Sequence, residues 1–523
     1  MAGRIVERAE TLWGANAQSA QSAPWLEYSP RRLLVGCSLV VVLCSLPVFL
    51  RTFLSDDTTY ALIAQKMNAG RVLYAEAADN KPPLIYATFA AMFRVFGAGH
   101  MVAVKLLTLA VNVASVLLMF SIGTHLFGRR GGVWTAFLFT GSILGGVYQD
   151  SIATNTETYM NLFTIAGLWV LARERLRLSP GALFATGLLL SVASLYRMQA
   201  VCVLAGIAAY LVVSLRFSPR AFLRLLILAA GFVIPYLITI GYFSARGALG
   251  DLWLWTIADN FFYVKVGSAT VAIARRMARI AGTVLSQLPM IVAALLAAGA
   301  GRAAAAADRN RLGFLLASLV GALVAYQVGG RFYGHYFLQV APFVCLLGAW
   351  GLTKVPADRF RALRRTLPAL VLVWCLGFAV TNFALLVRPS EDHNAVDRAV
   401  EYVWRNTSPQ DEILLWAGSP LLPFQSGRVF ATRFLNNNSM TGRIFGTAHV
   451  LPTATPEMNR SVERPEAWRL FWKDLDGAPP KLIVDGTVPN FEIAHYPRLA
   501  AFVAQHYASP LRFGSMNLYL RAD

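Results

Sequence analysis

Two adjacent carboxylates, Asp56 and Asp57, follow a long apolar run in the stretch LRTFLSDDTTYALIAQKMNAG, which begins at Leu50. A carboxylate at such a boundary can take the proton of a hydroxyl or amine acceptor during group transfer. It can also cap a helix, because acidic residues suit the exposed amides of a helix N-terminus. The pair is therefore a candidate general base, with a capped turn as the simpler interpretation.

The same loop continues as AEAADNKPPLIY, in which Asn80 and Lys81 precede two prolines. The prolines stiffen the backbone and remove two amide donors. A lysine held there can bind a phosphate as a point charge. A rigid connector with an ordinary interfacial lysine would show the same pattern, so Lys81 is a candidate phosphate ligand.

Two further stretches carry residues that suit the same chemistry. VYQDSIATNTETYM supplies Asp150 and Glu157, each of which is either a second functional carboxylate or a solvated surface residue. GGRFYGHYFLQ supplies Arg331, which could hold a phosphate with two hydrogen bonds, and His335, which could move a proton or ligate a metal. Tyr336 lies beside them, although an interfacial aromatic belt explains such residues more simply.

The composition places this chemistry in a membrane. The chain has 523 residues, of which 56% are hydrophobic and 14% charged, whereas soluble domains carry about a quarter charged residues. The net charge of +19 could suggest nucleic acid, but the basic residues gather in alternate loops between apolar runs, which is a topology signal. All five cysteines lie in apolar runs, so neither a disulfide framework nor a Cys-based metal motif is indicated.

We expect a polytopic α-helical membrane protein with about eleven transmembrane helices. The apolar runs lie near residues 33–53, 101–120, 132–148, 158–172, 180–196, 199–215, 225–244, 282–300, 312–328, 336–353 and 366–387. Segment 83–97 is apolar but short, and we expect it to be interfacial or re-entrant. Tyr60, Ile63, Ala64 and Met67 recur at helical spacing, which predicts an amphipathic helix along the membrane surface.

The arginine-rich loops share one side with the N-terminus, and the positive-inside rule makes that side cytoplasmic. Four segments then face outward: 54–100, 148–157, 245–281 and 329–335. The chain is expected to divide into three parts: a cytoplasmic N-terminal segment (1–32), a transmembrane catalytic domain (33–387) and an extracytoplasmic domain (388–523).

The C-terminal part alternates predicted helices and strands. AVDRAVEYVWRNT and EAWRLFWKDL have the pattern of helices, while EILLWAG and KLIVDG have that of buried strands. The alternation predicts a small α/β domain. This domain could cover the site, recognise an acceptor or be a purely structural cap.

The quoted motifs carry a family resemblance. DDTTYALIAQKM followed by DNKPPLIYATFAAMF resembles the first extracytoplasmic loop of the GT-C membrane glycosyltransferases. The nearest branch is the bacterial one related to protein O-mannosyltransferases and the lipid A aminoarabinose transferase (glycosyltransferase family 39-like). That pattern has an acidic pair, two variable residues and Tyr, then Lys-Pro-Pro-Leu. GGRFYGHYFLQVAPF is similar to a late loop of bacterial members, and the resemblance covers roughly residues 30–390.

The resemblance implies a polyprenyl-phosphate sugar donor and an inverting transfer, at the bacterial inner membrane, to an extracytoplasmic lipid, polysaccharide or protein acceptor. By the family pattern, Asp56 is the catalytic acid and Asp57 its neighbour, Lys81 lies at the donor phosphate, and Asp150 or Glu157 is the second carboxylate. The substrate site would also include further residues: Tyr60, Asn80, His335 and Tyr336. Aminoarabinose transferases carry Glu before Lys-Pro-Pro as part of a metal site, whereas this chain has Asn80, so a divalent metal and no cofactor both stay open.

Two other function classes are alternatives to the enzyme interpretation. A transporter or flippase of a lipid-linked substrate needs ionisable groups at mid-membrane and an inverted repeat, but the apolar runs hold few charges. A non-catalytic assembly protein would make the first-loop carboxylates dispensable. The enzyme interpretation predicts that four residues meet at one cavity beneath the C-terminal domain: Asp56, Lys81, Glu157 and Arg331.

Overall fold

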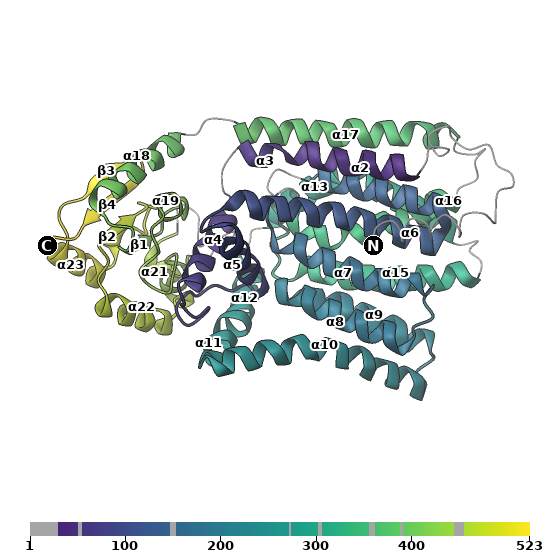
Figure 1. The fold of residues 1–523 in the computed structure, drawn as a ribbon, viewed down its shortest axis with the longest axis horizontal. Coiled ribbons are helices and arrows are strands. Elements are labelled where there is room, and N and C mark those ends of the chain that lie inside the picture. Colours follow the sequence, from purple (N-terminus) through teal and green to yellow (C-terminus); the bar gives the residue numbers. More distant parts are fainter. Residues whose placement is uncertain are drawn as a thin grey trace.

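The computed structural model describes residues 30–50, 55–146, 153–270, 273–301, 306–354, 361–387, 391–443 and 454–522. A bundle of long helices lies along the long axis of the molecule, and a mixed α/β domain lies at one end of it (Figure 1). Shorter helices, α4, α5, α11 and α12, lie between the two parts. We call this end of the bundle the capped end.

The helices of the bundle follow the predicted apolar runs. They are α2 (Pro30–Ser45), α3 (Pro47–Leu50), α6 (Met101–Leu144), α7 (Thr156–Arg173), α8 (Pro180–Tyr196), α9 (Ala200–Ser214), α10 (Pro219–Ala245), α13 (Ile273–Ser286), α14 (Leu288–Gly301), α15 (Ala306–Gln327), α16 (Ala341–Lys354) and α17 (Arg361–Val387). α8 packs against α7 and α10, α16 against α6 and α14, and α9 against α15.

Length and apolar composition single out some of these helices as membrane spans. Within the described ranges, α6 and α10 are long and apolar enough to cross a bilayer. α13 and α14 would add a third span if the pair, which is bent by 77°, is counted as one. The number of spans predicted from the sequence stays a prediction.

Helix α6 contains two predicted spans that fold back on each other at Gly128. This glycine has φ 78° and ψ 177°, which are not helical angles. A Cβ atom on Gly123 would lie 2.8 Å from the carbonyl oxygen of Gly131, and one on Gly132 would lie 2.8 Å from that of Phe120. Small residues therefore let the two halves approach closely, as two antiparallel helices joined by a tight turn.

The capped end is built from α4 (Ser55–Asn68), α5 (Leu84–Phe96), α11 (Leu249–Trp253), the π-helix η2 (Leu254–Ala258), α12 (Asp259–Thr270) and the 3-10 helix η3 (Gly334–Gln339). Helix α4 packs against α5 and against α19 of the C-terminal domain. Ala61 and Leu62 are 0% exposed, as are Ile63 and Ala64. The helix is therefore buried beyond the apolar stripe that periodicity predicted. Its place along the membrane surface stays a prediction.

The C-terminal domain contains the expected helices and strands as α18 (Glu391–Asn406), β1 (Ile413–Trp416), α22 (Pro465–Gly477) and β2 (Leu482–Asp485). The remaining elements are α19 (Leu421–Ser426), α20 (Asn438–Thr441), α21 (Pro456–Asn459), η5 (Arg460–Val462), η6 (Ile493–His495), α23 (Pro497–His506), β3 (Leu511–Phe513) and β4 (Met516–Leu520). The sheet order is β1-β2-β4-β3. β1 and β2 are parallel, while β4 is antiparallel to both of its neighbours.

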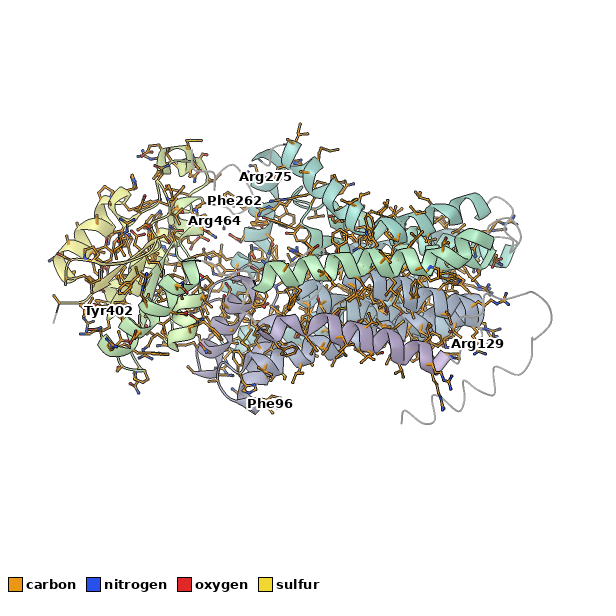
Figure 2. All side chains as sticks on the ribbon, turned by 90° about the horizontal axis from the view of Figure 1, so that it is seen from above. Phe96, Arg129, Phe262, Arg275, Tyr402 and Arg464 are labelled. Atoms are coloured by element: carbon orange, nitrogen blue, oxygen red, sulfur yellow. The ribbon has the colours of Figure 1, made fainter. Side chains whose placement is uncertain are left out.

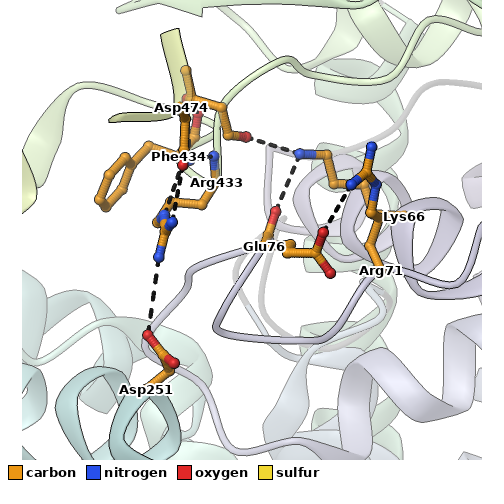
Figure 3. A network of polar contacts seen from close by, with 8 residues as sticks. Lys66, Arg71, Glu76, Asp251, Arg433, Phe434 and Asp474 are labelled. Carbon is orange, nitrogen blue, oxygen red and sulfur yellow. Dashed lines mark hydrogen bonds and ion pairs between the residues drawn. The ribbon is translucent and has the colours of Figure 1, made fainter. Parts of the chain in front are cut away.

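The C-terminal domain is joined to the loop between α4 and α5 by backbone and side-chain contacts (Figure 3). The amide of Ala78 donates to the carbonyl of Arg433 at 2.7 Å. The ammonium of Lys66 donates to the carbonyls of Glu76 and Thr432 at 3.1 and 2.9 Å. Arg433 is also ion-paired, with Asp474 at 2.9 Å and with Asp251 of α11 at 4.0 Å. The two parts therefore meet through the loop that carries Lys81.

Candidate functional site

A pocket with an empty volume of about 490 Å³ lies at the capped end. Its lining residues are Asn80, Lys81, Pro82, Arg197, Met198, Gln199, Asn260, Tyr263, Val264, Val328, Gly329, Arg331 and Tyr336. They come from the loop before α5, the turn between α8 and α9, helix α12 and the segment between α15 and α16. Three lining residues are cationic, and none of those described is acidic, so the pocket favours an anion.

Arg331 is positioned by a glycine turn and an aromatic ring. Gly329 and Gly330 have φ values of 88° and 61°, a conformation that glycine adopts without strain. The Arg331 side chain is 0% exposed, its guanidinium carbon lies 3.2 Å from the ring centroid of Tyr263, and Nη2 donates to the Tyr263 carbonyl at 3.4 Å. The carbonyl of Arg331 accepts a 2.7 Å hydrogen bond from Arg279. The guanidinium is thus held in one orientation at the pocket wall.

Arg197, in the turn after α8, forms a buried ion pair with Glu157 in the first turn of α7. Nη1 of Arg197 lies 2.9 Å from Oε1 of Glu157, and the side chains are 8% and 1% exposed. Nη1 also donates to Thr156 at 3.3 Å, and the guanidinium carbon lies 4.4 Å from the Tyr336 ring centroid. Burial lowers the pKa of Arg197, but Glu157 and Tyr336 raise that pKa more, so Arg197 stays charged. Nε2 of His335 lies 3.8 Å from the same Glu157 oxygen.

Lys81 extends from a loop whose backbone is tied at several points. The Tyr74 hydroxyl donates to the Lys81 carbonyl at 2.8 Å. The backbone amide of Asn80 donates to the Asp79 carboxylate at 2.7 Å, and the backbone carbonyl of Asn80 accepts from the side chain of Asn260 at 2.6 Å. The Lys81 ammonium donates to Oδ1 of Asn80 at 2.8 Å. These hydrogen bonds hold the loop at the pocket wall, and the role of Lys81 as a phosphate ligand stays a prediction.

Asp56 and Asp57 occupy the first turn of α4, where a capping pair is expected. The two differ in burial, since Asp56 is exposed and Asp57 is 2% exposed. Tyr60, one turn further on, packs edge-on against Tyr86 at a centroid distance of 5.7 Å. Burial raises the pKa of Tyr60 well above its usual value, and Asp56 and Glu157 raise it further. Neither Asp56 nor Tyr60 is among the residues that line the pocket.

Comparison with known proteins identifies the fold. Residues 80–239 match the family described as dolichyl-phosphate-mannose-protein mannosyltransferase. ArnT from Cupriavidus metallidurans, solved bound to undecaprenyl phosphate, is 16% identical with a TM-score of 0.63, and the match covers 93% of this chain and 97% of ArnT. The chain has the GT-C fold of membrane glycosyltransferases. The resemblance stated from the first-loop motifs is thereby confirmed.

Other GT-C structures agree. The apo state of the same ArnT is 15% identical over 93% of this chain and 97% of ArnT, with a TM-score of 0.60. The oligosaccharyltransferase of Archaeoglobus fulgidus, tethered to an acceptor peptide, is 14% identical over 95% of this chain and 74% of its own, with a TM-score of 0.50. No curated protein sequence matches the chain. At these identities the structures establish the GT-C fold alone.

The four residues expected at one cavity of the GT-C domain are brought together to different degrees. Lys81 and Arg331 line the pocket. Glu157 is connected to it through its ion pair with Arg197, whereas Asp56 does not line it. Asp150 lies outside the described residues. Asn80 and Tyr336 line the pocket, whereas Tyr60 and His335 are not among its lining residues. His335 stacks on Tyr333.

The sequence reasoning missed Arg197. The stretch LYRMQA places one arginine between two apolar runs that almost adjoin. An ionisable side chain so close to two predicted spans was the available signal. With regard to a metal, the part of the chain that the structure describes has no group of three or more His, Cys, Asp or Glu side chains placed to hold an ion.

Proposed function

We propose that this protein is an integral membrane glycosyltransferase that moves a sugar from a polyprenyl-phosphate donor to an extracytoplasmic acceptor, with inversion. The supporting observation is the pocket itself. It presents the cations Lys81, Arg197 and Arg331 beside apolar residues such as Val264 and Val328. A lipid phosphate offers a matching pair of features, an anionic headgroup and a hydrocarbon chain. The undecaprenyl phosphate bound to ArnT is such a molecule.

The donor phosphate is proposed to bind between Lys81 and Arg331. Arg197 is already ion-paired with Glu157 at 2.9 Å, so its charge is largely offset. Arg331 is fixed against Tyr263, and its planar guanidinium can give two parallel hydrogen bonds to phosphate oxygens. Negative charge develops on the phosphate as the sugar leaves, and cations placed in advance stabilise that charge.

Asp56 is proposed as the general base. It lies in the first turn of α4 and is exposed, so an acceptor hydroxyl or amine can reach its carboxylate. Removal of the acceptor proton makes the oxygen or nitrogen a stronger nucleophile. Attack on the sugar carbon from the face opposite the departing phosphate inverts that carbon. Asp57, which is buried, is assigned a supporting role in orienting the turn.

Glu157 is proposed to hold Arg197 rather than to take a proton. Its carboxylate is 1% exposed and faces Arg197 and His335, so an acceptor has little access to it. The second proton-accepting carboxylate, if the reaction uses one, is then Asp150.

The acceptor is proposed to reach the site at the junction of the bundle and the C-terminal domain. The domain is proposed to lie outside the cytoplasm and the N-terminus inside, in a bacterial inner membrane, because the basic loops lie on the side of the N-terminus. Lipid A or another glycolipid, a polysaccharide and a protein hydroxyl all fit the chemistry.

Mass spectrometry of envelope glycolipids and glycoproteins from a deletion strain tests the proposal. A mass deficit equal to one sugar on one class, restored by the wild-type gene and not by Asp56→Asn, would identify both substrates. Restoration by Asp56→Asn at wild-type level would contradict the enzyme assignment. It would favour a non-catalytic assembly role or a transporter.

A further inference from the structure

A buried ion pair joins the C-terminal domain to the helix beside the pocket. Arg464, the residue before α22, lies 2.9 Å from Asp259, the first residue of α12, and the two side chains are 16% and 15% exposed. The Arg464 guanidinium carbon lies 4.3 Å from the ring centroid of Phe262. Figure 2 shows Arg464 and Phe262 next to each other where the domain meets the bundle. The contact therefore combines an ion pair with a cation–π contact across the junction.

Helix α12 continues this contact into the donor loop. Asn260, the residue after Asp259, donates from its side chain to the backbone carbonyl of Asn80 at 2.6 Å. Oδ1 of Asn80 in turn accepts from the Lys81 ammonium at 2.8 Å. Asn80 therefore links the first turn of α12 to the Lys81 ammonium.

We propose that Arg464 is a positioning residue for the donor phosphate, acting on Lys81 through the first turn of α12 and Asn80. This inference rests on the proposed function, in which Lys81 binds the phosphate. A lysine side chain loses much rotamer freedom when it binds a ligand. An ammonium already ordered by Asn80 loses less, so binding is tighter. Docking of the C-terminal domain thereby sets the affinity of the membrane domain for its donor.

A second ion pair, within α22 itself, serves for comparison. Arg469 of α22 lies 3.0 Å from Glu466, but the side chains are 69% and 56% exposed. Arg469→Gln also removes one positive charge, five residues further along the chain, without changing a residue of the junction. It is therefore the matched control for Arg464→Gln.

The experiment measures the binding of undecaprenyl phosphate to the full chain in phospholipid nanodiscs. Arg464→Gln is expected to weaken binding about tenfold, with Arg469→Gln within about twofold of wild type. Arg464→Lys, which keeps the charge, should recover part of the loss. Asn80→Ala should weaken binding as Arg464→Gln does. The double variant Arg464→Gln/Asn80→Ala should be no weaker than either single one, because both break the same chain of contacts.

Three outcomes would overturn the proposal. If Lys81→Gln binds as tightly as wild type, the donor site is wrong, and the proposed function falls with the relay. If Lys81→Gln loses binding while Arg464→Gln matches Arg469→Gln, the relay alone is wrong. Additive losses for Arg464→Gln and Asn80→Ala would mean that Arg464 is only a structural contact. Should Arg464→Gln not fold, wild-type affinity in Asn80→Ala would be decisive against the relay.

Discussion

The guanidinium of Arg197 lies 2.9 Å from the carboxylate of Glu157, with both side chains almost fully buried. The pair offsets the charge of one of the three pocket cations, and Lys81 and Arg331 line the same pocket. The donor phosphate is assigned to Lys81 and Arg331 because the donor loop carries Lys81 and the Tyr263 ring orients the Arg331 guanidinium at the pocket wall.

Replacing one member of the Arg197–Glu157 pair should destabilise the protein more than replacing both. Arg197→Met or Glu157→Gln alone leaves one buried charge without its partner, which costs about 3–5 kcal/mol. The double variant Arg197→Met/Glu157→Gln should recover much of that loss. Thermal unfolding of the purified variants in one detergent measures this. Additive losses in the double variant would show that the two charges are not coupled.

Asp56→Asn should lower the rate of sugar transfer by about 10²–10⁴-fold, because the amide cannot take the acceptor proton. Its melting temperature and its affinity for undecaprenyl phosphate should stay close to wild type, because the side chain is exposed. Asp57→Asn should instead lower the melting temperature, since Asp57 is 2% exposed. If Asp56→Asn turned over at the wild-type rate, Asp56 would not be the base.

Lys81→Gln and Arg331→Gln should each weaken the binding of undecaprenyl phosphate, and the double variant should weaken it further. The wild-type affinity should fall as salt is raised, because screening reduces the attraction between the cations and the phosphate. The variants should show a shallower dependence on salt. Titrations at low and high salt in nanodiscs give both quantities. A salt dependence unchanged in the double variant would place the phosphate elsewhere.

The lowered pKa of the buried Lys66 predicts that the stability of the protein depends on pH. Burial lowers its pKa from 10.5 to about 8, although Glu412 partly opposes this. Between pH 8 and 10.5 the unfolded chain therefore binds more protons at this site than the folded chain, so stability rises with pH in that window. The full gain is about 3 kcal/mol, and below pH 8 the contribution of Lys66 is constant.

Lys66→Met should lose this rise, whereas Lys473→Met, which changes an exposed lysine of the same chain, should keep it. Melting temperatures recorded from pH 7.5 to 10 give the comparison. A wild-type curve parallel to that of Lys66→Met would show that Lys66 does not titrate in this range.

The helices of the bundle and the elements of the C-terminal domain could be predicted from the sequence. The run predicted at 180–196 coincides with α8 (Pro180–Tyr196), and KLIVDG contains β2. Apolar periodicity, prolines and glycines act within a few residues of the chain, so a local pattern is enough to place an element. The paired motifs around Asp56 and Lys81 were found in the same way.

The partners of the buried charges were decided by the tertiary structure. Arg197 stands alone in its turn, and only the packing of α7 against α8 brings Glu157 to it. Helix α4 looks amphipathic, but it packs against α19, and Ala61 and Leu62, which lie outside its apolar stripe, are buried too. Arg464 and Asp259 belong to different parts of the chain and meet at the junction. The sequence by itself determined which segments are helical and which side chains are charged. Only the fold decided which charges pair, because a buried ion needs a partner within about 4 Å and that distance is set by segments remote in the chain.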